Sequence, residues 1–227
     1  NDEWFCFSLD SVLLANFPKI KSKTKKILDL GTGNAVIPLV LSLRTKASIY
    51  GVDIQPDIIE MANKSIEYNN LQSQVKLEAC DMKSLLLRKN EYNTYDLILS
   101  NPPYFSNLES STKNDDIHKT IARHEVMIKL NDIINVASKL LKEGGTFALI
   151  HRTDRLVEII NCMQEYNIEP KLIKFVYKNM NSCSEMFYIE GIKNGGKGLK
   201  IAKPFVLYEV DGTKTFDYEQ LCKEVYL

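Results

Sequence analysis

The tetrapeptide Asn101-Pro102-Pro103-Tyr104 carries the most specific chemical signal in this 227-residue sequence. Its two prolines make the turn rigid and remove two backbone donors, which leaves the Asn101 side-chain oxygen and the Pro102 carbonyl as acceptors. Two acceptors that bind one amino group draw a ring-conjugated nitrogen toward tetrahedral geometry and free its lone pair to attack a methyl donor. Tyr104 could stack on an unpaired or flipped-out base, a contact worth about 1–3 kcal/mol. Because Asn-Pro is also common in ordinary turns, the neighbouring elements have to support this interpretation.

A glycine turn lies earlier in the chain. The run 26–30 predicts a short buried strand, and Gly31 and Gly33 follow it. Without a Cβ, these glycines let the backbone turn sharply and approach a ligand, and the helix expected over 35–43 offers free amides. A tight turn in any α/β protein would look the same. Ala35 stands near the third glycine position of a dinucleotide fingerprint, which favours a cofactor without phosphates.

Carboxylates follow the next two predicted strands. Asp53 ends a strand over 48–53, where its oxygens can accept both hydroxyls of a ribose. Asp81 follows a strand over 74–77, where it can accept the amino group of an adenine. Either residue could instead cap a helix. Both occur at the carboxyl end of a strand after the glycine turn, so together they indicate a bound nucleoside.

The order of the elements predicts the fold. Strands that alternate with helices form a mostly parallel sheet with helices on both faces, and the ligand lies at the carboxyl ends of the strands. We therefore expect an α/β, Rossmann-like fold with a seven-stranded sheet. Residues 26–227 would form one domain, and residues 1–25 a segment over the cofactor site. The predicted strands cover 26–30, 48–53, 74–77, 95–100, 146–150, 171–177 and 186–190; helices cover 35–43, 56–68 and 155–166, and a longer one from about Val126 ends at Gly144 and Gly145.

Composition and charge indicate the cellular compartment of the protein and the partners it could bind. The chain has 29 Lys and Arg against 29 Asp and Glu, so charge balance gives no argument for nucleic acid, although a neutral protein can carry a basic face. The odd number of cysteines, five, and their lack of CxxC spacing favour reduced thiols in a cytoplasmic protein without a cysteine metal site. No apolar run has membrane-spanning length and no secretory signal is visible, so we expect no membrane association.

Two basic clusters could contact phosphates and give salt-sensitive affinity, although single lysines are usually just solvated. The first comprises Lys19, Lys21, Lys23, Lys25 and Lys26, and the second Lys171, Lys174, Lys178, Lys193, Lys197, Lys200 and Lys203; Arg123, His124, His151, Arg152 and Arg155 could line the approach to the site.

The chain resembles the tRNA1(Val) (adenine-37-N6)-methyltransferase family, which belongs to the class I S-adenosylmethionine-dependent methyltransferases. The similarity covers nearly the whole chain and extends beyond the tetrapeptide, which several families share. The segments that carry it are Phe7-Ser8-Leu9-Asp10, Leu13-Leu14-Ala15-Asn16-Phe17, Asp29-Leu30-Gly31-Thr32-Gly33 with Ile37-Pro38-Leu39, Ala122-Arg123-His124-Glu125, His151-Arg152 with Arg155-Leu156, and Gly198-Leu199-Lys200.

The resemblance implies S-adenosylmethionine as the methyl donor and the N6 amino group of a tRNA adenine, adenine-37 of tRNA1(Val), as the acceptor. The adenine would be single-stranded or flipped out, and no metal is implied. On this basis we assign Asp29, Gly31, Gly33, Asp53, Ile54, Asp81, Met82 and Asn101 to the cofactor, Asn101, Pro102 and Tyr104 to catalysis, and Pro103, Tyr104, Arg123, His124 and Arg152 to the RNA substrate.

Three alternatives differ in substrate or in activity, and the first of them shares the tetrapeptide. Protein glutamine-N5 methyltransferases that act on release factors carry a helical N-terminal domain, whereas 25 residues precede the first predicted strand here. DNA adenine methyltransferases usually need a recognition domain that the sequence does not show. A catalytically inactive cofactor- or RNA-binding module would not need an intact tetrapeptide. We therefore expect direct in-line methyl transfer without a covalent enzyme intermediate.

Overall fold

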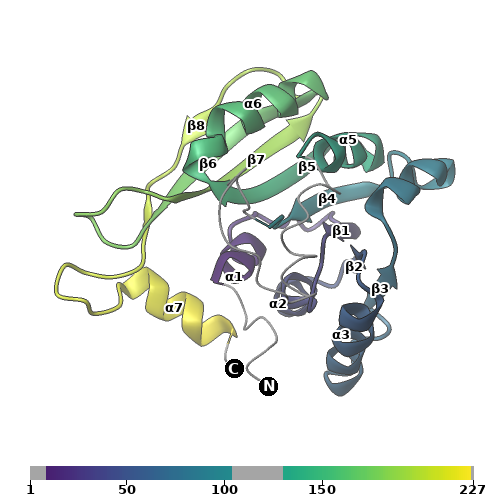
Figure 1. Ribbon diagram of the computed structural model, residues 1–227, viewed down its shortest axis with the longest axis horizontal. Coiled ribbons are helices and arrows are strands. Elements are labelled where there is room, and N and C mark those ends of the chain that lie inside the picture. Colours follow the sequence, from purple (N-terminus) through teal and green to yellow (C-terminus); the bar gives the residue numbers. More distant parts are fainter. Residues whose placement is uncertain (1–8, 104–129, 226–227) are drawn as a thin grey trace, which may run out of the picture.

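The computed structural model describes residues 9–103 and 130–225, which form a mostly parallel sheet with helices on both faces (Figure 1). None of the helices in these two ranges is long and apolar enough to cross a membrane. In chain order the elements are α1 (Leu9–Asn16), β1 (Lys26–Leu30), α2 (Val36–Arg44), β2 (Ser48–Asp53), α3 (Pro56–Tyr68), β3 (Val75–Ala79), the 3-10 helices η1 (Met82–Leu87) and η2 (Lys89–Glu91), β4 (Tyr95–Ser100), α5 (Leu130–Leu140), β5 (Leu141–Arg152), η3 (Thr153–Arg155), α6 (Leu156–Glu165), β6 (Ile168–Tyr177), β7 (Met186–Lys193), β8 (Lys200–Ile201), β9 (Phe205–Val206) and α7 (Phe216–Val225).

The strand order is β3-β2-β1-β4-β5-β7-β6-β8, and β9 also pairs with β6. The five strands β1 to β5 run parallel to one another, whereas β7 is antiparallel to both of its neighbours, β5 and β6. All seven predicted strands are present, and the two-residue strands β8 and β9 extend the sheet to nine. The order reverses at β1, which pairs with β2 on one side and β4 on the other, and such a switch point leaves room for a ligand.

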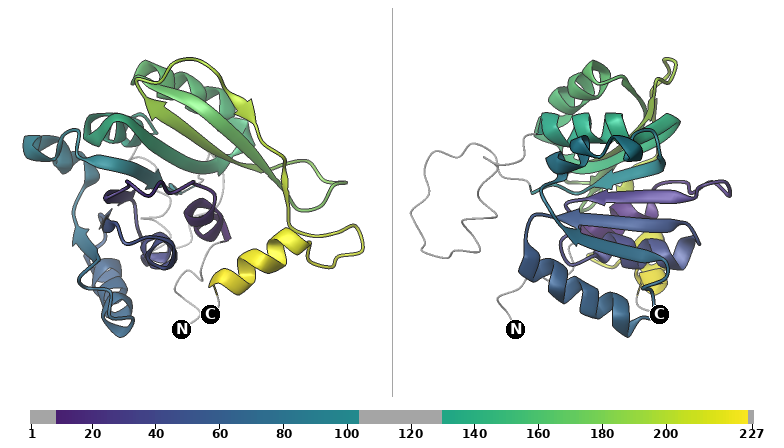
Figure 2. Two further views of the ribbon diagram at one scale, coloured as in Figure 1. Left: turned by 180° about the vertical axis from the view of Figure 1, so that it is seen from behind. Right: turned by 90° about the vertical axis from the view of Figure 1, so that its right-hand side faces the viewer.

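Two apolar clusters cover the two faces of the sheet, because successive residues of a strand point to opposite faces. In β4, Leu97 and Leu99 pack in the cluster that includes α1, α2 and α3, whereas Ile98 packs in the cluster that includes α5 and α6. Figures 1 and 2 show α1 and α2 on one side of the sheet and α5 and α6 on the other. The residues of β1 after Lys26, which are all buried, are thus shielded from both sides.

The boundary between α5 and β5 differs from the prediction. The helix ends at Leu140, and Gly144 and Gly145 lie within β5 instead of terminating the helix. The reason is a register shift between β4 and β5: Leu141 already pairs with Tyr95, and Gly144 has a φ of 70° that accommodates the irregularity. The strand predicted over 74–77 lies at Val75–Ala79. The polar segment 106–116 and the expected helix start near Val126 lie outside the described residues.

The amino end of the sheet is held together by Asp96 in β4. One of its oxygens accepts the backbone N–H groups of Lys25 and Lys26 at 2.8 and 3.0 Å, and the other accepts Lys142 Nζ at 2.8 Å. Burial raises the pKa of Asp96, but the bonds from Lys142, Lys25 and Lys26 outweigh it, so the pKa lies below its ordinary value. Asp96 therefore fixes the start of β1 beside β4 and β5.

The Asp96→Asn substitution should lower the free energy of unfolding at pH 7 by about 1.5–3 kcal/mol, because charge-assisted hydrogen bonds are lost. Since the folded-state pKa is depressed, this stabilisation is present above the ordinary carboxyl pKa and is lost as pH falls through the folded value. Urea unfolding at pH 7 and pH 3 measures both effects. The control Glu60→Gln breaks an ion pair between Glu60 and Lys64. Because the Glu60 side chain is 75% exposed, the control should cost under about 0.5 kcal/mol. An equal deficit for Asp96→Asn at both pH values would contradict this role.

Candidate active site

The glycine turn and the tetrapeptide emerge side by side at the carboxyl edge of the sheet. Leu30 pairs with Val52 on one side and with Ser100 on the other. The N–H groups of Gly31 and Thr32 both donate to the Val52 carbonyl at 2.9 Å, and Ser100 Oγ donates to the Leu30 carbonyl at 2.8 Å. These bonds fix the ends of three strands, so the predicted turn and the predicted acceptors meet at the switch point.

The glycine turn has a backbone that a ligand can approach closely. Gly31 and Gly33 have φ values of 78° and 50°, in the left-handed region that favours glycine. A Cβ built at either glycine would have no described atom within 4 Å. Ala35, at the position where a third glycine was considered, also has a left-handed φ of 59°, and the buried helix α2 starts directly after it. The turn can therefore admit a ligand against its backbone.

Asp53 links the second strand to this turn. It is 9% exposed; Oδ2 accepts the Gly33 N–H at 2.9 Å and Oδ1 accepts the Gln55 N–H at 3.1 Å. A carboxylate oxygen has two acceptor positions, so each oxygen can still accept a ligand hydroxyl. The next residue, Ile54, is 38% exposed and could cover an apolar ligand face. The positions of both residues agree with the proposed ribose and cofactor contacts, which stay predictions.

Asp29, in β1, is completely buried. Among the described residues, neither carboxylate oxygen makes a hydrogen bond of good geometry, and the same holds for the Thr32 hydroxyl. Burial raises the pKa of Asp29 to about 7; the Thr32 hydroxyl is near enough to oppose this rise, and the charge of Asp53 adds to it. A buried carboxylate without a partner is costly, so a ligand with a positive charge or with donors would relieve it.

Asp81 caps a helix, which the sequence analysis gave as an alternative to a contact with adenine. Its Oδ1 accepts the Lys83 N–H at 2.8 Å and so caps η1. The side chain of Met82 is only 4% exposed and packs in the cluster with α5, which leaves its backbone for any ligand contact. The cofactor contacts of Asp81 and Met82 stay predictions.

Asn101 lies at the end of β4 and contacts the N-terminal helix. Its Nδ2 donates to Ser11 Oγ at 2.9 Å. Pro102 is half-buried and Pro103 is exposed. The sequence interpretation missed Ser11; the only hint was its place directly after the segment Phe7–Asp10, which carries part of the family resemblance. Tyr104, Arg123 and His124, three of the predicted site residues, lie outside the described residues.

The end of β5 lies beside the end of β4 and carries His151 and Arg152. From the sequence we expected both residues to line the approach to the site, but only Arg152 is exposed. Arg152 is exposed and lies 3.6 Å from Asp154. His151, by contrast, is buried, and its Nδ1 accepts the Arg152 N–H at 2.8 Å. Burial, together with the charge of Arg155, lowers the pKa of His151 to about 4. His151 is therefore buried and neutral at pH 7, and it is not an exposed contact.

The two basic clusters do not converge on this site. Lys26 starts β1, so the run before it lies at the opposite, amino edge of the sheet. In the second cluster, Lys193 donates to the Leu141 carbonyl at that same amino edge, and Lys174 lies over the Phe17 ring at 4.4 Å. Lys178 is exposed and follows the carboxyl end of β6, on the side of the site. The clusters seen in the sequence therefore do not form one face.

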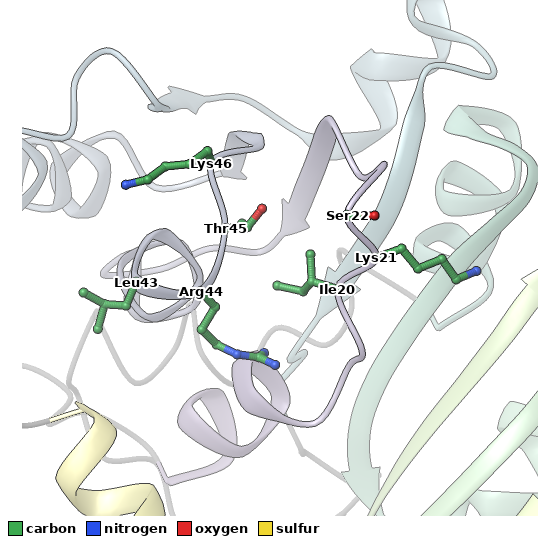
Figure 3. Close-up of a pocket in the computed structure, with 7 residues that line it drawn as sticks. All are labelled: Ile20, Lys21, Ser22, Leu43, Arg44, Thr45 and Lys46. Atoms are coloured by element: carbon green, nitrogen blue, oxygen red, sulfur yellow. The ribbon is translucent and has the colours of Figure 1, made fainter.

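A cavity of about 410 Å³ also lies away from the glycine turn (Figure 3). Because α2 starts at the turn and ends at Arg44, the residues around Arg44 mark the far side of the molecule. The Arg44 guanidinium donates to the Ala15 and Pro18 carbonyls, which holds the segment after α1 against α2. This cavity is therefore separate from the candidate site; it is lined by Ile20, Lys21, Ser22, Leu43, Arg44, Thr45 and Lys46.

The Asp29→Asn substitution should change how the stability of the ligand-free protein depends on pH. Between the ordinary pKa of 3.8 and about 7, the folded state binds more protons than the unfolded state, so the free energy of unfolding falls as pH rises. The total fall from this one group is about 4 kcal/mol, since one pKa unit corresponds to about 1.4 kcal/mol. Asp29→Asn should therefore gain stability relative to native protein between pH 5 and pH 8 in urea unfolding. A gain of the same size from the exposed control Asp57→Asn would refute this assignment.

Comparison with known proteins supports this geometry. Residues 21–202 match the family model described as a methyltransferase domain. A relative from Parabacteroides distasonis is 30% identical over 161 residues, covering 71% of this chain and 65% of the relative. One from Porphyromonas gingivalis is 35% identical over 134 residues, covering 58% and 51%. Both are named tRNA1(Val) (adenine(37)-N6)-methyltransferase, and the chain thus spans between half and two thirds of their length.

Solved structures share the fold at low sequence identity. A predicted O-methyltransferase from Agrobacterium tumefaciens has a TM-score of 0.74 and 18% identity, covering 96% of this chain and 97% of that one. A SAM-dependent methyltransferase from Aquifex aeolicus has a TM-score of 0.54 and 14% identity, covering 80% and 87%. The shared fold agrees with the strand order and the glycine turn, and the family model covers most of the sequence. The chain belongs to the methyltransferase domain family.

Proposed function

We propose that this protein transfers a methyl group from S-adenosylmethionine to the N6 amino group of an adenine in tRNA. The observation that carries the proposal is the position of Asn101 and Pro102 at the switch point, directly beside the Gly31–Gly33 turn. In the proposal, the Asn101 side-chain oxygen and the Pro102 carbonyl are paired acceptors, and the neighbouring glycine turn holds the cofactor. The names of the relatives support tRNA as the substrate and adenine-37 of tRNA1(Val) as the target.

The residues at the glycine turn fit S-adenosylmethionine. The cofactor carries an ammonium group, a sulfonium and an adenosine but no phosphate, and when bound it supplies an electrophilic methyl group. The buried carboxylate of Asp29, which has no well-formed hydrogen bond to the described residues, suits its positive charge, and the lack of described atoms near a Cβ built at Gly31 or Gly33 suits its close approach. We assign the ribose hydroxyls to Asp53 and the adenine to the surroundings of Ile54, Asp81 and Met82.

On the substrate side, the chain supplies hydrogen-bond acceptors. Because Asn101 Nδ2 donates to Ser11, its Oδ1 is the end of the amide that can accept from a substrate amino group. The Pro102 carbonyl is the second acceptor. To reach this turn the adenine has to be unpaired or flipped out of its helix, where Pro103, Tyr104, Arg123, His124 and Arg152 are the proposed contacts. The methylated nitrogen is acidic enough to release its proton to water.

The alternatives differ in substrate and not in site chemistry. A glutamine amide nitrogen is also planar and would accept help from the same two acceptors. The names of the relatives favour RNA over a release factor, and the paired acceptors beside a cofactor turn favour catalysis over a mere binding module. A tRNA substrate also makes the cytoplasm the proposed setting.

The Asn101→Ala substitution should lower turnover about 100-fold or more, because a hydrogen-bonding group used in the transition state is removed. The affinity for S-adenosylmethionine, measured by calorimetry, should fall much less than turnover, because Gly31, Gly33 and Asp53 keep the other proposed cofactor contacts. The control Asn69→Ala removes a side-chain bond to the Ser65 carbonyl at the end of α3, far from the site, and should retain activity.

Substrate class is tested by incubating native protein with methyl-labelled cofactor and, separately, total RNA, release factors or duplex DNA. Mass spectrometry of the digested products should show N6-methyladenosine in the tRNA fraction. Label in the release factors would replace the RNA assignment, and native-like turnover of Asn101→Ala would rule out the proposed acceptor role.

A further inference from the structure

We propose that Ser11 is a positioning residue that sets which end of the Asn101 amide faces the substrate amino group. The inference rests on the proposed function and deepens it by adding a residue of the N-terminal helix to the site. The observation is the hydrogen bond from Asn101 Nδ2 to Ser11 Oγ, 2.9 Å long, between residues 90 positions apart in the sequence.

Both partners of this bond are held by the fold. The residues after Ser11 in α1, from Val12 to Ala15, are buried in the cluster that also covers β4. Helix α1 contacts α2 and β5, and the Arg44 guanidinium binds the Ala15 carbonyl at the end of α1 (Figure 1). On the other side, Ser100 is fixed to β1 through the Leu30 carbonyl. The serine hydroxyl is thus a fixed reference point for a side chain at the end of a central strand.

An asparagine needs such a reference because the two ends of its amide have opposite chemistry. The oxygen accepts hydrogen bonds, whereas the NH₂ group only donates them. A half-turn about the last side-chain torsion of Asn101 would present NH₂ to a substrate NH₂, and neither group could accept from the other. Ser11 Oγ accepts from Nδ2 and so favours the orientation in which Oδ1 is the substrate-facing end.

The tetrapeptide offers little help of its own. Pro102 and Pro103 have no N–H group, so the two residues after Asn101 cannot donate a backbone hydrogen bond to its oxygen or order the turn by pairing. These two residues therefore do not set the orientation of the amide, and the bond to Ser11 contributes to it. A carboxylate in place of the amide would not have this dependence, because its two oxygens are equivalent acceptors.

The Ser11→Ala substitution should lower kcat on unmethylated tRNA transcripts about 2- to 10-fold, the range expected when one neutral hydrogen bond is lost. Cofactor affinity should stay within about twofold, because Ser11 acts on the substrate-facing side chain. Ser11→Thr keeps the hydroxyl and should restore at least half of the native kcat. The matched control Ser138→Ala removes a helix serine whose Oγ donates to the Tyr166 carbonyl at 2.7 Å, in the cluster on the opposite face of the sheet, and should leave kcat unchanged.

A second readout does not depend on activity. The side-chain NH₂ signals of Asn101 in a ¹⁵N-labelled sample are identified by their loss in Asn101→Asp. They should be protected from exchange with solvent in native protein and in Ser11→Thr, and should lose protection in Ser11→Ala but not in Ser138→Ala.

Three outcomes would overturn the proposal: native kcat in Ser11→Ala, an equal loss of kcat in Ser11→Ala and Ser11→Thr, or unchanged protection of the NH₂ signals in Ser11→Ala. If native protein methylates no RNA, the proposed function fails, and the NH₂ signals still decide whether Ser11 orients Asn101. If Ser11→Ala does not fold, Ser11→Thr provides the comparison: loss of the protected signals in that variant overturns the proposal, and their retention with native kcat supports it.

Discussion

The pairing of β1 with two parallel neighbours decides where everything else in this site lies. Leu30 is in register with Val52 and with Ser100, so the chain leaves three adjacent strands at the same level. The next described helix after β1 is α2, on one face of the sheet, and the next after β4 is α5, on the other face. Such a switch point leaves room for a ligand between the strand ends. The strand ends are closed by internal bonds, from the Gly31 and Thr32 N–H groups to Val52 and from Ser100 to Leu30. The polar groups at this edge are thus largely committed to holding the turn in shape.

The two carboxylates near the turn, Asp29 and Asp53, differ in their hydrogen bonding. Asp53 is satisfied by the N–H groups of Gly33 and Gln55 and builds the turn. Asp29 is fully buried, and among the described residues its oxygens have no well-formed hydrogen bond. An unsatisfied buried group costs about 1–3 kcal/mol, and more when charged. In the proposed site, the arrival of a cation or donor would relieve this cost, so Asp29 would contribute to ligand affinity and Asp53 to the shape of the turn.

Elements whose boundaries depend on local chemistry were predictable from the sequence. Strands β1, β2 and β4 and helix α3 have the predicted limits, because buried apolar runs, a glycine turn and the proline at the start of α3 mark them. The predicted end of α5 was wrong, because the sequence does not distinguish a glycine pair in an irregular strand, here Gly144 and Gly145, from a pair that ends a helix. The separation of the lysines of the second cluster was not predictable for a different reason: Lys178 follows β6 and Lys193 ends β7, and because these strands are antiparallel the two lysines lie at opposite edges of the sheet. Whether either cluster contacts RNA stays a prediction.

The contact between Ser11 and Asn101 could not be predicted, because no local pattern reports a pairing across 90 residues. It also crosses the boundary that the sequence suggested between an N-terminal segment, 1–25, and the domain that follows. The methyltransferase family model starts at residue 21, after α1, yet α1 packs on α2 and β5 and binds the side chain that follows β4. Pro102 and Pro103 have no N–H groups with which to orient the Asn101 side chain. The fold meets that need with a helix that comes before the first strand, so the unit that arranges these acceptors is larger than the strands and loops that carry them.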